Sequence, residues 1–559
     1  MSDKENIMPT KVYKKNLEEF IKFIDQKKFA VPEFQRGYVW RVANVKCLFD
    51  SLVKKYPIGS FVLWETTQNI DARTINGAKL PKKKFLILDG QQRILSLYYL
   101  CKQKVFSQHT VRDRFHQISE AKHNQLIDFE KFYILNNNGE PTLEYGRDSD
   151  NEFDFKKFKN LLGKTYSFPI VVASLKNYRK AIEVFERINQ AGTRIATESI
   201  FLSETWSKHC DFAKLLRKWK KNNQGAISKG IDTVIFIHAF SLTCQLDGYK
   251  KTKVRDSIGV EIKILKKIAE IVREEESDKY NTKFEKVVQA VAEAVRYLIG
   301  EYNIKSLSDI PSQTMLTVLS VFFFYKKGHD PSNNEKNELR KWFWRSSLEN
   351  RYIGAGYNKN IGPDALGMKK LAVTGRRLDM PFKKVHISDF AGIELRSGRS
   401  TLRNIIKQAL WQQMPVFIDG SKIMRQDTEV KHKNPEHDHF FPFDLYRKGI
   451  LGSEVNNIFN LHFLHGGENP SKGKKLPSDW LRQREKEIKP KKKDIENYFK
   501  SELLPFKSIN ELEKFERVFE RKSGKRNEEL IRHRYEVFLK KRFKLLKDTL
   551  IRLQNGKSK

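Results

Sequence analysis

The chain has 559 residues, and because a single hydrophobic core usually stops growing at roughly 250–300 residues, we expect two or three domains. Its formal net charge is +38, from 106 Lys and Arg against 68 Asp and Glu. This charge exceeds what solubility needs and indicates a polyanionic partner, with nucleic acid as the leading candidate. The four cysteines form no CxxC pair, which argues against a disulfide framework and against a cysteine-ligated zinc site. The most apolar run, Met315–Tyr325, is too short to span a bilayer, so we expect a soluble cytoplasmic protein without membrane contact.

The first part of the chain predicts a compact α/β or α+β domain. Apolar residues at three-to-four spacing from Val42 to Val53 predict an amphipathic helix. Short apolar runs predict strands at Phe61–Glu65, Lys84–Asp89 and Phe168–Ala173, and Gly90 precedes an apolar-faced helix from Gln91 to Leu100.

The middle of the chain is dominated by helical periodicity from about Ser203 to Tyr357. Weak periodicity with several glycines from Asn358 to Ser400 predicts a linker or domain edge. A lysine-rich run around Lys489–Lys493 precedes a helical C-terminus. The sequence as a whole therefore predicts an α+β protein with a helical middle region.

Three segments near the C-terminus carry the strongest chemical signal: EHDHFFP at Glu436–Pro442, NLHFL at Asn460–Leu464 and NPSKGKK at Asn469–Lys475. Hydrolysis of a phosphodiester needs a base to activate water and a divalent cation to neutralise the phosphate. Histidine supplies a base near neutral pH, and Asp and Asn oxygens suit Mg²⁺ or Mn²⁺. The alternative to a catalytic site is that His and Asp are neighbours by chance in a basic chain. The occurrence of three such segments in this order argues against chance.

Together, DH-x-x-P, NL-x-x-L and N-x-x-K resemble the HNH nuclease signature and its ββα-metal fold, over about residues 431–480. The resemblance implies that Asp438 and Asn469 are metal ligands, that His439 is the general base and that Asn460 holds the loop bearing this histidine. Two further residues would lie near DNA phosphates: Lys472 and Lys474. The cysteine-free variant of the domain is implied. Four neighbouring residues are interpreted as packing, solvated or peripheral groups: Glu436, His437, His462 and His465.

Near the N-terminus, LILDGQQRILSL (Leu86–Leu97) places Asp-Gly-Gln-Gln-Arg at a strand-to-helix junction. Backbone N–H groups at a helix start attract phosphate, and Arg93 could clamp it. The alternative is structural, since an Asp that caps a helix and pairs with an Arg is common, and Tyr38 and Trp40 would then be core residues. The residues alone leave both open.

PEFQRGYVW, YPIGSFVLWE, DGQQR and FERINQAGT together resemble the ParB/sulfiredoxin-like domain of GmrSD-type restriction proteins, over about residues 15–205. The resemblance implies nucleotide binding and hydrolysis without a P-loop, with an NTP such as GTP. The implied nucleotide site comprises Gln35, Arg36, Asp89, Gln91, Gln92 and Arg93. The turn that carries Arg187, Asn189 and Thr193 is expected to close the same cleft.

The two resemblances imply a type IV restriction arrangement for anti-phage defence: a sensing domain at 1–205, a helical region at 206–400 and an HNH nuclease domain at 401–559. The expected partners are double-stranded DNA, in modified form, a nucleotide and a second copy of the chain. Two alternatives stay open: a non-catalytic sensor of modified DNA, and an NTPase regulator that acts with a separate nuclease.

Overall fold

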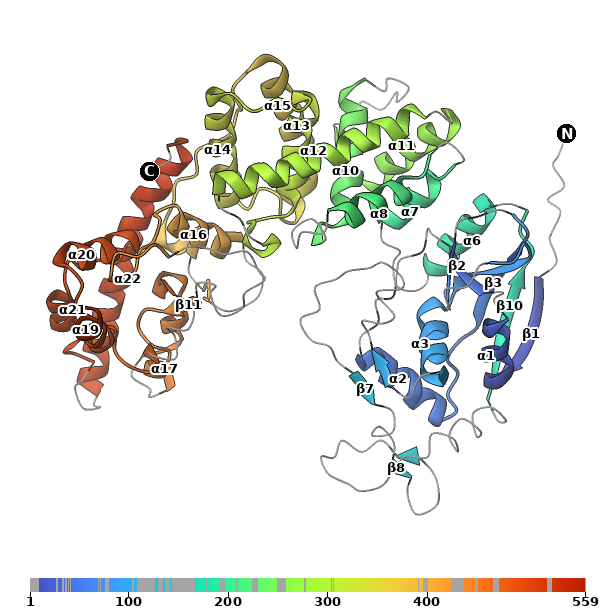
Figure 1. Cartoon of the computed structure of the whole chain (residues 1–559), viewed down its shortest axis with the longest axis horizontal. Helices are drawn as coiled ribbons and strands as arrows, with labels where there is room; N and C mark the ends of the chain where they lie inside the picture. Colours follow the sequence, from blue (N-terminus) through green and yellow to red (C-terminus); the bar gives the residue numbers. More distant parts are fainter. Residues whose placement is uncertain are drawn as a thin grey trace. The chain divides into compact units, whose positions relative to one another are not determined.

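The computed structural model divides the chain into two compact units, Met1–Asn222 with Leu265–Thr282, and Asn223–Ile264 with Lys283–Lys559 (Figure 1). The boundary expected at residue 400 lies inside the second unit. The structure describes residues 10–26, 29–32, 35, 38, 40, 42–68, 70, 72–75, 80–102, 105–107, 126–128, 134–135, 141–142, 166–176, 178–190, 197–207, 210–223, 230–248, 258–275, 278–302, 304, 306–390, 392–395, 401–423, 436–447, 451–465, 472–519 and 525–557.

The first unit is built on a mixed six-stranded sheet with the order β1-β10-β3-β5-β2-β4. Neighbouring strands are antiparallel except for the pairs β10–β3 and β5–β2, which are parallel. The strands are β1 (Thr10–Asn16), β2 (Phe29–Pro32), β3 (Phe61–Thr66), β4 (Ala72–Thr74), β5 (Lys84–Asp89) and β10 (Ser167–Ala173).

Helices cover both faces of this sheet. One core combines the sheet with α1 (Leu17–Asp25), α2 (Val42–Val53) and α3 (Gln91–Lys102), and the other packs α6 (Tyr178–Gln190) on the opposite face. In β5, Ile87 enters the first core while Leu86 and Leu88 enter the second, which explains the continuous apolar run of this strand. The predicted strands and helices of this domain are confirmed.

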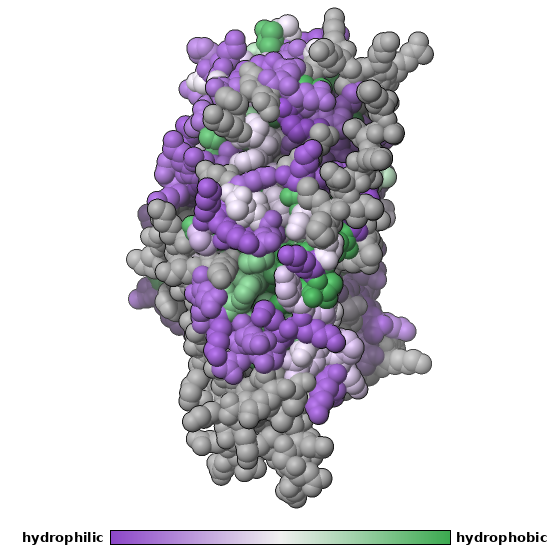
Figure 2. All heavy atoms as spheres, turned by 90° about the vertical axis from the view of Figure 1, so that its right-hand side faces the viewer, coloured by the Kyte–Doolittle hydropathy of each residue, from purple (hydrophilic) through white to green (hydrophobic). Residues whose placement is uncertain are grey.

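Further elements complete the first unit. Two small antiparallel sheets pair β6 (Val105–Ser107) with β7 (Leu126–Asp128) and β8 (Ile134–Leu135) with β9 (Pro141–Thr142). The remaining helices are α7 (Thr197–Glu204), α8 (Phe212–Asn222) and α11 (Ile262–Glu275), of which the last begins in the second unit. Among the residues coloured in Figure 2, most are hydrophilic and a small hydrophobic area lies near the middle of the view.

Over the residues that the structure describes, the second unit consists of helices and one two-stranded hairpin. Its first helices are α10 (Thr233–Leu246), α12 (Lys279–Tyr302), α13 (Thr314–Lys326), α14 (Asn333–Leu348), α15 (Ala355–Thr374) and α16 (Thr401–Trp411). Helix α13 is apolar all round and buried from Met315 to Phe323, between α10 and α15. Among the described residues, no helix has the length and apolar character needed to cross a membrane.

The linker predicted at 358–400 is wrong for its first part, because α15 continues to Thr374 and ends at Gly375 in the left-handed region. Gly362 serves packing rather than flexibility. A Cβ on Gly362 would lie 1.6 Å from the carbonyl oxygen of Ile258, so only glycine allows this close backbone approach.

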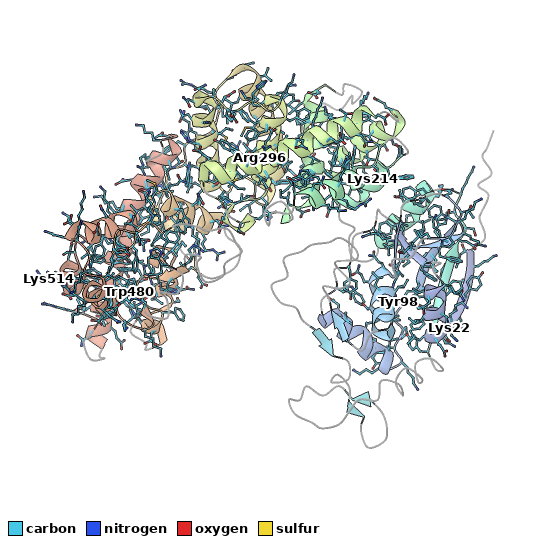
Figure 3. All side chains as sticks on the ribbon, in the orientation of Figure 1. Lys22, Tyr98, Lys214, Arg296, Trp480 and Lys514 are labelled. Atoms are coloured by element: carbon cyan, nitrogen blue, oxygen red, sulfur yellow. The ribbon has the colours of Figure 1, made fainter. Side chains whose placement is uncertain are left out.

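The C-terminal part contains the hairpin of β11 (Glu436–His439) and β12 (Leu461–Leu464), together with α17 (Asp444–Arg447), α19 (Pro477–Ile488), α20 (Lys492–Ser501), α21 (Ile509–Glu516) and α22 (Lys525–Gln554). Aromatic side chains fill the space between these elements. Trp480 of α19 is fully buried between them, whereas Lys514 of α21 lies on the outside of this part of the chain (Figure 3). The hairpin is therefore held in a helical frame.

Candidate active site

The β11–β12 hairpin brings two of the three C-terminal segments together. Its strands are antiparallel, with Asp438 opposite His462 and His439 opposite Leu461. Because side chains alternate along a strand, directly opposed residues lie on the same face of the hairpin. Asp438 and His462 therefore face each other.

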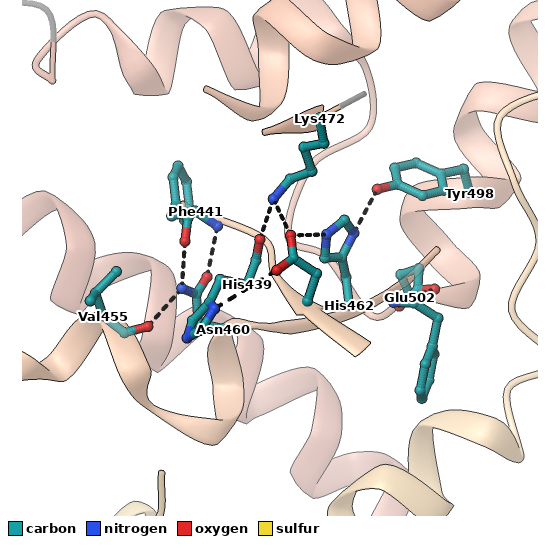
Figure 4. Close-up of polar contacts among 10 residues, drawn as sticks. His439, Phe441, Val455, Asn460, His462, Lys472, Tyr498 and Glu502 are labelled. Carbon is teal, nitrogen blue, oxygen red and sulfur yellow. Dashed lines mark hydrogen bonds and ion pairs between the residues drawn. The ribbon is translucent and has the colours of Figure 1, made fainter. Parts of the chain in front are cut away.

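Asp438 is the centre of a buried polar cluster (Figure 4). Its Oδ2 accepts a hydrogen bond from Nζ of Lys472 at 2.7 Å and lies 4.0 Å from Nε2 of His462. Burial alone would raise the pKa of Asp438, but the neighbouring His439 ring and the positive charge of Lys472 hold it well below its usual range. Asp438 is therefore a carboxylate at neutral pH.

His439 is 3% exposed, and its ring is oriented by an asparagine. Nε2 lies 2.9 Å from Oδ1 of Asn456, and Nδ1 lies 3.9 Å from Oδ1 of Asp438. An amide oxygen only accepts, so this contact assigns the ring proton to Nε2 and leaves Nδ1 as the basic atom. The ring is thus set to accept a proton on the side that faces Asp438.

Asn460 ties the end of β11 to the segment that precedes β12. Its Oδ1 accepts from the backbone N–H of Phe441, and its Nδ2 donates to the carbonyls of Phe441 and Val455, each at 2.8 Å. Its own carbonyl accepts from the N–H of Phe440 at 2.6 Å. The side chain is fully buried, and it fixes the two residues after His439.

Helices close the cluster behind His462. Tyr498 of α20 lies with its hydroxyl 3.4 Å from Nδ1 of His462, and the ring of Trp480 lies 6.2 Å from the imidazole. Burial lowers the pKa of His462 well below its ordinary value, and the charge of Lys472 adds to this effect. His462 is therefore neutral, with Nε2 lacking a hydrogen-bond partner among the described residues.

Two further buried residues, Glu502 and Arg542, support the hairpin and the segment before it. Glu502 accepts from the N–H of Phe463, and Arg542 of α22 donates to the carbonyls of Phe459 and Glu502 at 2.7 and 3.0 Å. Burial raises the pKa of Glu502 to about 8, and burial lowers the pKa of Arg542 to about 10. The C-terminal helix is thus hydrogen-bonded to the segment before β12 and to Glu502, whose side chain binds β12.

The donor set around Asp438 suits a divalent ion in part. Two ligand atoms bound at about 2.1 Å to one ion are at most about 4.2 Å apart, and Asp438 Oδ2 and His462 Nε2 are 4.0 Å apart. Nε2 of His462, which is buried and has no hydrogen-bond partner among the described residues, and the carboxylate of Asp438 are both suitable ligands. No group of three or more His, Cys, Asp and Glu side chains with metal geometry occurs among the described residues.

Three further residues were expected at the C-terminal site: Asn469, Lys472 and Lys474. Asn469 lies outside the described residues. Lys472, expected beside phosphates, is instead fully buried against Asp438 and the carbonyl of His439. The side chain of Lys474 is 74% exposed, 3.8 Å from Asp444. His465 contacts the hydroxyl of Ser421 at 2.8 Å.

The DGQQR segment lies at the junction of β5 and α3, where Gly90 takes a φ of +87°. Arg93 donates to Asp89 at 2.9 Å and to the carbonyl of Ile58, and its guanidinium lies over the Phe61 ring. A Cβ on Gly59 would come within 2.6 Å of this guanidinium. Arg93 therefore fastens the start of α3 both to the end of β5 and to the loop before β3, with Asp89 still 30% exposed.

The glutamines of the expected nucleotide site have structural partners. Gln35 is buried and donates to the carbonyls of Ile87 and Leu88 of β5. Gln92 accepts from the N–H of Trp40 at 3.2 Å, and Gln91 is buried.

These contacts bring Gln35, Asp89, Gln91, Gln92 and Arg93 to the end of β5. Arg36, Thr193 and the side chain of Asn189 lie outside the described residues. Arg187 is exposed and pairs with Glu183 at 2.8 Å.

Comparison with known families bears on the domain that carries this junction. Residues 17–206 match the GmrSD restriction endonuclease N-terminal domain. The GmrSD match covers every strand of the six-stranded sheet except β1, which precedes it, together with α1, α2, α3 and α6. It supports a relationship to restriction endonucleases, and with it DNA as the partner.

The chain also resembles a protein over most of its length. It is 24% identical over 536 residues to the uncharacterized protein MJ0686 of Methanocaldococcus jannaschii, and the alignment covers 84% of this chain and 86% of that protein. The alignment therefore extends beyond the GmrSD N-terminal domain into the helical second unit, where the hairpin site lies.

Sequence reasoning missed several residues of the hairpin site. His462 was interpreted as a packing residue although it faces Asp438, and Asn456, Glu502 and Arg542 were not considered. The signal for His462 was available, because an antiparallel hairpin with His439 opposite Leu461, the second residue of NLHFL, places His462 opposite Asp438. Arg542 lies eighty residues away in a helix of mixed charge, and only the fold brings it to the site.

Proposed function

We propose that this protein is a metal-dependent DNA endonuclease of the modification-dependent restriction type, with phosphodiester hydrolysis at the β11–β12 hairpin. The observation that carries the proposal is the hairpin itself. Asp438 and His439 lie side by side on β11, and Asn460 fixes the backbone that follows them. The match to the GmrSD N-terminal domain and the charge of +38 both favour DNA as the substrate.

In this proposal His439 takes a proton from water through Nδ1, because Nε2 is committed to Asn456. Asp438 and Asn469 would hold Mg²⁺ or Mn²⁺, and His462 is a further candidate ligand. The ion would neutralise the charge that develops on the phosphate. Lys472 must release Asp438 before that carboxylate can bind an ion.

The test is a plasmid-nicking assay with His439→Ala in Mg²⁺ or Mn²⁺. The expected result is a loss of about 10²–10⁴-fold in rate, with folding and DNA affinity retained, because only proton transfer is removed. His533→Ala, at an exposed histidine of α22, is the matched control and should cleave normally. Cleavage by His439→Ala at the rate of the control would overturn the proposal. Unmodified, glucosylated and phosphorothioated plasmids, with and without GTP, identify the preferred substrate.

The β5–α3 junction supports a nucleotide-dependent regulatory role for the first unit. Two of the donors of Arg93 are used in the contacts described above, and further N–H donors of this guanidinium can bind an anion. Asp89→Asn keeps an oxygen for Arg93 but removes the charge. We expect it to lower nucleotide turnover while metal binding at the hairpin persists, as measured by phosphate release and by a metal-dependent thermal shift. An equal loss of both would indicate misfolding and count against this role.

One observation favours a second candidate, a DNA-binding sensor that does not cut. Lys472 already neutralises Asp438, so the site holds a protein cation where the nuclease needs a metal ion. A sensor would bind DNA tightly and in a salt-sensitive manner, and would nick none of the three plasmids in any divalent ion.

A further inference from the structure

A cluster of exposed lysines lies where α19 ends and α20 begins, within the lysine-rich run noted in the sequence. We call it the lysine turn, and it comprises Lys486, Lys489, Lys491, Lys492 and Lys493. None of these five side chains forms an ion pair with any described residue. The two acids of this stretch are engaged elsewhere: Glu487 with Arg484 at 2.6 Å, and Asp494 with the backbone N–H of Lys491 at 3.3 Å. The positive charge of the turn is therefore not neutralised by the protein.

Three of these lysines lie at the start of α20, where a positive charge is unfavourable for the helix. Lys491 is the N-cap of α20, and Lys492 and Lys493 occupy its first turn. The N-terminus of a helix carries a partial positive charge, so lysines there weaken the helix. Lys489 has a φ of +52°, in the left-handed region. Positive charge that destabilises its own helix is expected where a surface binds an anionic partner.

The lysine turn lies close to the hairpin site, because both helices that flank it contact His462. Lys489 follows Trp480 by nine residues and Lys492 precedes Tyr498 by six, which at about 1.5 Å per residue gives roughly 14 and 9 Å along the two helices. The loop before the hairpin gives an independent connection. A Cβ on Gly420 would lie 3.1 Å from Asp494, and the adjacent Ser421 contacts His465 at 2.8 Å.

We propose that the lysine turn binds the phosphate backbone of duplex DNA three to four base pairs from the phosphate that is cut. The distance to the cut follows from the proposed function, whereas binding of duplex does not. Each strand presents one phosphate per about 3.4 Å of the duplex axis, so a reach of 9–14 Å along that axis corresponds to three to four base pairs. Lysines contact phosphates as point charges, so the turn adds affinity and orientation without reading sequence.

The test uses the full chain with His439→Ala, so that binding is measured without cutting. The variant K491Q/K492Q/K493Q is compared with K214Q/K218Q/K221Q, which removes the same charge from exposed lysines of α8, where Lys214 is labelled in Figure 3. Affinity for a duplex of about 30 base pairs is measured by fluorescence anisotropy between about 50 and 200 mM salt.

The slope of log affinity against log salt should fall by about 2.7 for the lysine-turn variant, since each lost phosphate contact contributes about 0.9. Affinity near 0.15 M salt should fall roughly 100-fold, against less than about threefold for the α8 variant. The thermal midpoint of the lysine-turn variant should be unchanged or higher, which excludes misfolding as the cause.

Equal losses in the two variants, or an affinity within threefold of the parent for the lysine-turn variant, would overturn the proposal. So would equal competition by single-stranded RNA, because the surface would then not be one for duplex DNA. If the lysine turn is required for binding and the wild-type protein nicks no plasmid, the proposed nuclease function fails while the binding surface stands.

Discussion

Replacement of Asn460 gives the sharpest test of how the hairpin is held. The side chain is fully buried and makes three hydrogen bonds of 2.8 Å, with the N–H and carbonyl of Phe441 and the carbonyl of Val455. Asn460→Ala removes all three and leaves these backbone groups without their side-chain partner. Asn460→Asp keeps the acceptor for Phe441 but places a charge against the two carbonyls.

The expected loss of folding stability follows from the number of buried backbone groups that are left without a hydrogen-bond partner. A buried polar group left unsatisfied costs about 1–3 kcal/mol. The carbonyl of Val455 retains a long contact with the hydroxyl of Tyr535 at 3.5 Å, so it contributes least. We therefore expect Asn460→Ala to destabilise the second unit by about 3–5 kcal/mol, a large part of the typical stability of a domain. Asn460→Asp should cost at least as much.

The assay is urea unfolding combined with hydrogen exchange of the peptide that contains Phe441. The matched control is Asn457→Ala, because the side chain of this neighbouring asparagine accepts a single hydrogen bond among the described residues, from the N–H of Phe459 at 2.9 Å. Loss of that cap should cost about 1 kcal/mol. The reasoning is refuted if Asn460→Ala is no more destabilising than Asn457→Ala, or if the Phe441 amide stays equally protected.

Two further perturbations test the electrostatics of the site. The pKa of Glu502 is raised to about 8 by burial, so the folded state keeps a proton that the unfolded state releases above about pH 4.3. Stability should therefore fall as the pH rises from about 4.5 to 8, by up to about 1.4 kcal/mol per unit. Glu502→Gln should flatten this dependence in urea titrations at several pH values, and parallel profiles for the two proteins would contradict it. Lys472→Met leaves Asp438 buried without its cation and should destabilise the metal-free protein by about 3–5 kcal/mol. Because the carboxylate is then open to an ion, Mn²⁺ should raise the thermal midpoint of this variant more than that of wild type; an equal shift would count against Asp438 as a metal ligand.

The sequence alone determined the local elements of the first unit and the order of the chemical segments. The three-to-four spacing of Val42–Val53 and the apolar runs of β3, β5 and β10 depend on local backbone preference and on burial of one or two faces. The prediction of a linker was wrong for the glycine-containing segment from 358 to 374. A glycine that allows close approach of a neighbouring backbone cannot be told by composition from a glycine in a flexible loop. Local pattern cannot distinguish these two uses.

Only the tertiary structure decided which side chains meet at the hairpin. Asp438 contacts Lys472 across thirty-four residues, and the hairpin rests on Arg542, which reaches Phe459 across eighty-three. These contacts join segments that no periodicity links, and they form because burying a carboxylate requires a cation or donor from whichever helix packs over it. Lysine is read from sequence as a solvated or phosphate-binding residue, since its burial depends on a partner that only the fold supplies. For this reason the sequence indicated which residues carry the chemistry, and the packing of α19, α20 and α22 around the hairpin decided which of them are buried and paired.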